Sequence, residues 1–198
     1  MAAKIGRNFY NGMKNDMKRV VYFLRKVFQM TIVLLMLLML VAAGVYQAGR
    51  DIIDRRTVSD FDLESFMGRW YEIARFDHKF ERGLSDVTAD YTLGDDGVVE
   101  VVNSGMRGGV ERRAVGRAKT TKQTGQLRVS FFWIFYSDYN ILEMGEQGEW
   151  ALVGSRSPQY LWILSRTPSL PKDTLDQIMQ RAERRGYNTE KLIIDNGD

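Results

Sequence analysis

Cysteine is absent from the 198-residue sequence, and histidine occurs once. Without cysteine the chain cannot form disulfides, act through a thiol nucleophile, bind a metal through thiolates or carry a lipid on an N-terminal cysteine. A single histidine excludes a metal site built from several histidines. We therefore expect no metal centre and no cofactor.

Excess positive charge is confined to the N-terminal end of the chain. The whole sequence has a formal net charge of +3 and a pI of about 9.1. Seven lysines and arginines precede Gln29 against the single acidic residue Asp16, which gives this stretch +6 and leaves −3 for the rest. Because the larger part of the chain is mildly acidic, we do not expect a groove that binds nucleic acid.

A long apolar run follows the basic stretch. Residues 27–46 include only Gln29, Thr31 and Gly44 outside the large apolar residues and alanine. Twenty residues at about 1.5 Å each span about 30 Å, the thickness of the hydrocarbon core of a bilayer. The run also lacks the polar stripe of a helix that packs on a protein core. It predicts a transmembrane helix over residues 27–48.

The charges on either side of this helix predict its orientation. Positive charge is concentrated before it, whereas basic and acidic residues alternate after it. By the positive-inside rule, residues 1–26 form a basic cytoplasmic tail, and the following domain is membrane-anchored on the periplasmic or envelope side. A cleaved signal sequence that ends at the small residues 41–43 is the alternative, and it exports the same domain. Residues 49–61 are expected to form a linker and residues 62–198 the folded domain.

Short runs rich in β-branched and aromatic residues recur through the domain. Turns that contain glycine and aspartate or glutamate separate them, such as residues 94–97 and 145–148. Eight such runs with short connections predict a mainly β fold, an eight-stranded antiparallel up-and-down barrel. The predicted strands are residues 70–76, 87–93, 98–104, 111–120, 127–132, 138–144, 150–155 and 160–165.

A helix is predicted after the eighth strand. Asp173 or Thr174 can cap its start, apolar residues recur at helical spacing from Leu175 to Ala182, and Gly186 ends it. A short final strand over residues 191–195 can then pair with the barrel.

Three motifs carry a resemblance to a known family. The first is Gly68-Arg69-Trp70 at the start of the first strand, the second is Ser137-Asp138-Tyr139, and the third is the segment YLWILSRTP, which contains Arg166. Together they resemble the lipocalins, and most of all the Blc-type bacterial and apolipoprotein D branches of that family. Two features depart from the Blc-type pattern, because a hydrophobic helix replaces the acylated cysteine and Ser137 replaces a threonine.

The resemblance implies roles for the motif residues and a carrier function. Trp70 plugs the closed end of the barrel, and Arg166 lies across it, where a stacked cation contributes about 1 to 2 kcal/mol. Gly68 and Asp138 belong to the same structural motifs. A small apolar ligand is expected to occupy the barrel above this floor.

Strand alternation predicts which residues line the interior. Residues two apart in a strand share a face, and Trp70 and Arg166 are taken to point toward the barrel axis. The resulting pocket is aromatic and aliphatic with few polar groups, which suits a lipid tail better than a sugar or a nucleotide. The residues expected to bind the ligand are Glu72, Ala74, Phe76, Ala114, Gly116, Ala118, Val129, Phe131, Tyr139, Ile141, Tyr160 and Trp162.

We expect a non-enzymatic lipocalin that binds and carries lysophospholipids or fatty acids at the envelope membrane. A lipid-modifying enzyme on the same scaffold and a membrane-tethered interaction module are the alternatives. Asp77 and His78 resemble an acid/base pair, but no hydrolase-type serine motif accompanies them, so a solvated loop histidine is the better interpretation. The inward carboxyl of Glu72 needs a partner or a raised pKa, and we expect it to bond a ligand head group or an internal arginine such as Arg112. The apolar loop over residues 133–136 is expected to be a rim for lipid entry. A partner surface and a loop folded onto its own barrel are the alternatives, and the sequence does not decide whether the protein forms a homodimer through this rim.

Overall fold

The computed structural model describes residue 17 and residues 22–41, 53–132 and 134–195, which belong to two separate units. In the unit before Ile52, the described residues include a helix, Tyr22–Val41, that is long and apolar enough to cross a membrane. It begins earlier than the predicted residue 27, so Arg25 and Lys26 lie within it. The predicted end at residue 48 falls outside the described residues.

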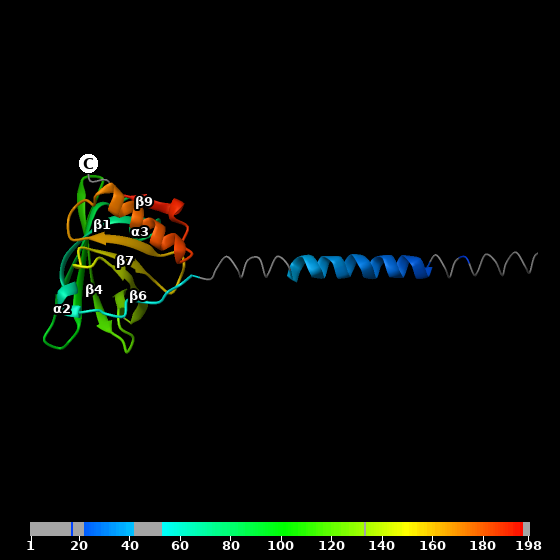
Figure 1. Cartoon of the computed structure of the whole chain (residues 1–198), viewed down its shortest axis with the longest axis horizontal. Helices are drawn as coiled ribbons and strands as arrows, with labels where there is room; N and C mark the ends of the chain where they lie inside the picture. The colour runs from blue at the N-terminus through cyan, green and yellow to red at the C-terminus, as the bar shows by residue number, and fades with distance from the viewer. Residues whose placement is uncertain (1–16, 18–21, 42–52, 133, 196–198) are drawn as a thin grey trace, which may run out of the picture. The chain divides into compact units, whose positions relative to one another are not determined.

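The second unit is a closed antiparallel barrel (Figure 1). Eight strands follow one another around it in chain order, and β1 pairs with both β2 and β8, which closes the sheet. The predicted fold class is therefore confirmed, including the helix and the short strand after the barrel. The strands are Gly68–Phe76 (β1), Ser85–Leu93 (β2), Val99–Arg107 (β3), Val110–Thr120 (β4), Gln126–Phe132 (β5), Phe135–Met144 (β6), Trp150–Gly154 (β7) and Leu161–Ser165 (β8).

The strands match the predicted runs except near two hairpins that are tighter than expected. β3 and β4 continue to the Gly108-Gly109 turn, where φ values of +58° and +75° allow a two-residue hairpin. β6 begins at Phe135 because that residue pairs with Phe132 of β5. The predicted apolar loop over residues 133–136 is therefore a hairpin tip, and Trp133 lies outside the described residues.

A short helix and an aromatic cluster close one end of the barrel. Helix α2 (Leu63–Phe66) enters β1, and Trp70 is fully buried with its Nε1 donating to the carbonyl of Phe66 at 2.8 Å. The Arg166 guanidinium carbon lies 3.8 Å from the centre of the Trp70 ring, as the family resemblance implies. Its two Nη atoms donate to the carbonyls of Arg69 and Ser65 at 3.0 and 2.6 Å. These bonds fix the guanidinium in place and give the barrel a rigid floor.

Helix α3 (Lys172–Arg184) packs on the outside of the barrel. Ile178 and Ala182 are buried in a cluster with apolar residues of β7 and β8, which we call the outer cluster. The N-cap is Pro171, with no side-chain hydrogen bond, so the predicted cap at Asp173 or Thr174 is wrong. Proline has a fixed φ near that of a helix start, and Asp173 lies in the first turn, where its charge favours the helix dipole.

The final strand β9 (Leu192–Ile194) extends the sheet beside β1. It pairs with the second half of β1, from Ala74 to Phe76, whereas β2 pairs with the first half, from Gly68 to Tyr71. Between these halves, the pairing of β1 with β8 shifts register between Glu72 and Ala74. This β-bulge puts Ile73 and Ala74 in the same outer cluster and reverses the alternation that follows.

The segment expected to be a linker packs against the barrel from Ile53 onward. Ile53 is buried in the outer cluster, and the amide of Asp54 donates to the carbonyl of Arg185 at 2.9 Å. The amide of Val58 donates to the carbonyl of Ile141 on β6 at 3.0 Å. Residues 53–58, which we call the clamp segment, are therefore part of the folded unit.

Candidate functional site

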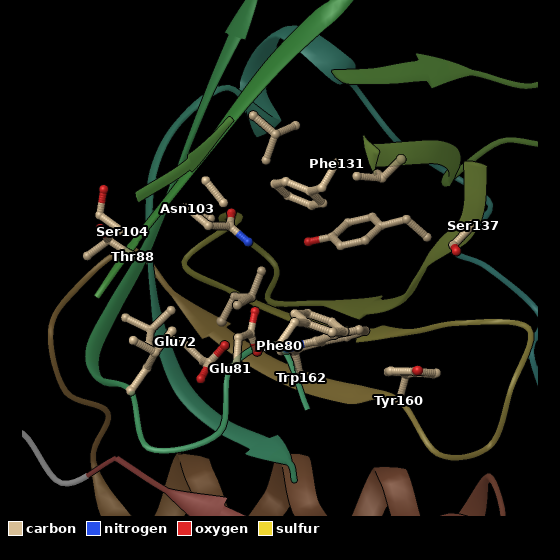
Figure 2. A pocket seen from close by; sticks show the side chains of 18 of the residues that line it. Glu72, Phe80, Glu81, Thr88, Asn103, Ser104, Phe131, Ser137, Tyr160 and Trp162 are labelled. Carbon is tan, nitrogen blue, oxygen red and sulfur yellow. Dashed lines mark hydrogen bonds between the residues drawn. The ribbon is translucent and has the colours of Figure 1, made fainter. Parts of the chain in front are cut away.

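A cavity of about 530 Å³ occupies the barrel above its floor (Figure 2). Most strands and the loop between β1 and β2 contribute side chains to its wall, and most of these side chains are apolar. Pockets that bind small ligands have volumes of about 300 to 1,000 Å³, so the space suits one such molecule.

Seven of the twelve residues predicted to bind a ligand line this cavity. They share the inward face of β1, β4, β5, β6 or β8, or lie just before β8. They are Glu72, Ala114, Val129, Phe131, Tyr139, Tyr160 and Trp162. The motif residue Asp138 also borders the cavity and lies 3.4 Å from Nε of Arg128.

Ala74 and Phe76 do not line the cavity, because the bulge in β1 reverses the alternation. Both are buried in the outer cluster, and the Phe76 ring lies 6.2 Å from that of Tyr187. In their place Arg75 turns inward, where its side chain is 3% exposed. Alternation alone cannot reveal a single inserted residue of this kind.

Gly116, Ala118 and Ile141 lie on the inner face but do not border the cavity. Ala118 and Ile141 are fully buried in the core that also contains Trp70, below the open space. Above Gly116, the Phe131 ring fills the position that a side chain would take, since an added Cβ would lie 2.7 Å from Phe131 Cδ1. The open cavity is thus shorter than the barrel interior.

The prediction omitted the contributions of β2, β3 and the loop between β1 and β2. Val87, Ala89 and Tyr91 follow the period-two pattern of an inward face and could have been found by it. Phe80 and Glu81 come from the loop, where no periodicity applies. Their position over the cavity depends on how that loop folds back.

Four ionisable side chains form a buried cluster at the wall made by β1, β8 and this loop. Nη1 of Arg75 donates to Oε1 of Glu72 at 2.7 Å, and Nη2 donates to the carbonyls of Glu81 and Leu84. Nε2 of His78 lies 2.9 Å from Oε2 of Glu81. The expected partner of Glu72, Arg112, is therefore wrong, and His78 is buried rather than solvated. The partner of Glu72 is Arg75, which lies three residues later in the same strand, whereas the prediction placed it across the barrel.

Burial and the neighbouring Glu81 carboxylate together raise the pKa of Glu72 to about 8, and Arg75 opposes the shift only in part. Near neutral pH this buried cluster therefore holds a proton. The hydroxyls of Tyr91 and Tyr139 meet at 2.7 Å inside the barrel, and burial raises the pKa of both.

Replacement of Glu72 by glutamine is expected to flatten the pH dependence of stability. The folded-state pKa of Glu72 lies above its ordinary value of 4.5, so its favourable contribution is complete below that pH and is lost as the pH rises toward 8. The difference in free energy of unfolding between Glu72→Gln and the unmodified protein should shift in favour of the variant across this range. Urea unfolding at several pH values measures it, with the exposed Glu111→Gln as a control. Parallel pH profiles for Glu72→Gln and the unmodified protein would contradict the assigned shift.

The mouth of the cavity combines basic and apolar side chains. Arg107, Arg112 and Arg113 border it from the β3–β4 hairpin, and none of them forms an ion pair within the described part of the chain. At the β5–β6 hairpin Phe132, Ile134 and Phe135 are 75%, 71% and 76% exposed. We call these three residues the apolar rim.

Comparison with known proteins identifies the family. The lipocalin-like domain family matches residues 61–196. The chain belongs to this family. Outer membrane lipoprotein Blc of Vibrio cholerae is 41% identical to this lipocalin over 143 residues, which cover 70% of this chain and 84% of that protein. Blc of Escherichia coli K12 is 42% identical over 140 residues, which cover 69% of this chain and 79% of that protein.

More distant relatives agree with this assignment. Apolipoprotein D of Bos taurus is 30% identical over 145 residues, which cover 68% of this lipocalin and 76% of that protein. The solved structure of insecticyanin from Manduca sexta has a TM-score of 0.60 at 21% identity, over 75% of this chain and 90% of that one. This last similarity shows the fold alone.

The family generally consists of binding proteins, and a barrel of eight strands is just wide enough to enclose one small ligand. Across residues 22–41, 53–132 and 134–195, no cluster of histidine and acidic side chains could hold a metal ion. The geometry of the site is that of a binding cavity with acidic side chains on one wall and basic side chains at its mouth.

Proposed function

We propose that this lipocalin binds and carries a lipid with a long apolar chain, such as a lysophospholipid or a fatty acid, without chemical conversion. The apolar cavity, closed by Trp70 at one end and bordered by the apolar rim at the other, carries this proposal. About 15 methylene groups at ~0.8 kcal/mol each would gain roughly 12 kcal/mol on burial. The costs of association and ordering offset much of that gain.

We also propose that the helix Tyr22–Val41 tethers the protein to a membrane of the cell envelope, with the barrel outside the cytoplasm. Two observations support the tether: the length and apolar composition of the helix, and the concentration of basic residues before it. The Blc relatives are named outer membrane lipoproteins, whereas this chain has no cysteine to carry a lipid.

Lipid extraction and direct titration test the carrier function together. The full chain is purified from its host, and mass spectrometry identifies any lipid that is retained. A stripped sample is then titrated with a lysophospholipid and with a fatty acid. Saturable binding at one site per chain supports the proposal, and the absence of saturable binding to either lipid would overturn it.

Replacement of the apolar rim is expected to slow lipid exchange with membranes. Phe132 and Phe135 project into solvent and contribute little to the core. The double variant Phe132→Ser, Phe135→Ser should therefore change the free energy of unfolding by less than about 1 kcal/mol. The rate at which a fluorescent fatty acid transfers to vesicles should fall about tenfold or more, because the rim no longer offers an apolar path. Val115→Ser, a similarly exposed apolar residue on the barrel wall, is the control. Equal transfer by both variants would exclude the rim from lipid exchange.

A further inference from the structure

Two carboxyl groups lie side by side on a cavity wall that is otherwise largely apolar. Glu72 and Glu81 both border the cavity, with side chains only 4% and 6% exposed, and Figure 2 shows them close together beside Trp162. Arg75 is the one permanently charged basic group that contacts the pair within the described residues. Nε2 of His78 lies 2.9 Å from Oε2 of Glu81, and an imidazole is not a permanent cation. The cluster therefore has one more acidic group than it has permanent cations.

An unpaired carboxylate in such a place is costly, so the cluster must hold either a proton or another cation. Arg75 cannot compensate both groups, because Nη1 is directed at Glu72 and Nη2 at two main-chain carbonyls. Among the described residues, Arg75 is the side chain that donates to Glu72, and the carboxyl of Glu81 lies within hydrogen-bonding reach of it. The nine-tenths buried carboxyl of Glu72 is part of the cavity wall.

Aromatic rings adjoin the two carboxyl groups. The indole Nε1 of Trp162 donates to Oε2 of Glu81 at 3.2 Å, and the Tyr160 ring stacks on that of Trp162 with centroids 5.9 Å apart. Both rings border the cavity. Carboxylates next to aromatic faces attract an ammonium group through charge and through the ring quadrupole.

The basic residues of the cavity lie on a different wall. Arg107, Arg112 and Arg113 belong to β3 and β4, whereas Glu72 and Trp162 belong to β1 and β8, which are hydrogen-bonded neighbours. The cavity is thus acidic on one wall and basic on another. An anionic head group would be repelled by the acidic wall, and an amine would be attracted to it.

We propose that Glu72, Glu81, Trp162 and Tyr160 form a subsite for an ammonium group on the head of a bound amphiphile. This proposal rests on the lipid binding described under the proposed function. The ammonium group would take the place of the proton that the buried cluster holds, so binding should release a proton below about pH 8. The groups that face Glu72 are Arg75 on its own strand, His78 and Glu81 on the following loop, and Tyr91 and Tyr139 across the barrel.

Amphiphiles with one alkyl tail and three different heads test the subsite. A trimethylammonium, a carboxylate and an uncharged sugar head are compared by calorimetric titration of the full chain, held in solution by a non-ionic amphipathic polymer. The trimethylammonium probe should bind about tenfold more tightly than the sugar probe, as a desolvated cation over aromatic rings allows. Titration in buffers of different ionisation enthalpy should show proton release near pH 7 and almost none above pH 9.

Matched variants separate the subsite from the rest of the cavity. Glu81→Gln should remove the tenfold preference for the trimethylammonium head over the sugar head. The exposed Glu111→Gln makes the same change in charge outside the cavity wall and should keep the preference. If Glu81→Gln fails to fold, proton release by the unmodified protein still decides the matter.

Three outcomes would overturn the proposal, and they differ in whether lipid binding by the cavity is retained. Equal affinity for the sugar and trimethylammonium heads removes the ammonium subsite but leaves lipid binding intact. Tight trimethylammonium binding without proton release removes the role of the carboxyl pair. Failure of every probe to bind removes the carrier function as well.

Discussion

Trp70→Ala is expected to lower the free energy of unfolding by about 3 to 5 kcal/mol, the cost of a large cavity in a closed core. Trp70 is fully buried, contacts the Phe66 ring at 4.9 Å between centroids and supports the Arg166 guanidinium. Its removal leaves that guanidinium without its aromatic partner. Urea unfolding of the full chain, followed by circular dichroism, measures the change.

The control for this prediction is another aromatic residue outside the core. Phe132 is three-quarters exposed, so Phe132→Ala should change stability by about 0.5 kcal/mol or less. A similar decrease in the free energy of unfolding for Trp70→Ala and Phe132→Ala would mean that packing at the floor does not stabilise the barrel more than an exposed ring does.

Ala114→Trp is expected to weaken lipid binding about tenfold or more. Ala114 borders the cavity and is already exposed toward it, so a large ring can enter the ligand space without displacing buried neighbours. Displacement of two methylene groups of a bound tail at ~0.8 kcal/mol each corresponds to about tenfold in affinity. Titration with a fatty acid measures the loss.

The neighbouring residue supplies a matched control. Val115 lies next to Ala114 on β4 but does not border the cavity, and it is 55% exposed. Val115→Trp adds a ring of the same size to the outside of the barrel and should leave affinity within about twofold. If both variants bind lipid normally, the ligand does not occupy this part of the cavity.

The sequence allowed prediction of the barrel because its determinants are local. Alternating strands, glycine turns and the pairing of Trp70 with Arg166 all repeat short patterns or known motifs. The same alternation placed Glu72, Val129 and Trp162 at the cavity.

The acidic wall could not be predicted in this way, because a bulge and a folded loop create it. Ala74 and Phe76 follow the inward parity of Trp70 in the sequence, but one extra residue in β1 turns them to α3 and brings Arg75 inside. His78 and Glu81 become buried only when the loop folds back onto the barrel. Such contacts depend on three-dimensional proximity and leave no periodic signal.

The clamp segment has a mechanical consequence for a tethered barrel. Tension along the chain from the N-terminal side would reach the barrel through residues 53–58, which are bonded to Arg185 and to Ile141. The side chain of Thr57 adds a bond to the carbonyl of Thr124, in the loop that joins β4 to β5, away from the hairpins of the mouth. Tension from the N-terminal side would therefore be borne by several hydrogen bonds of the clamp segment, none of which involves the hairpins at the mouth of the cavity.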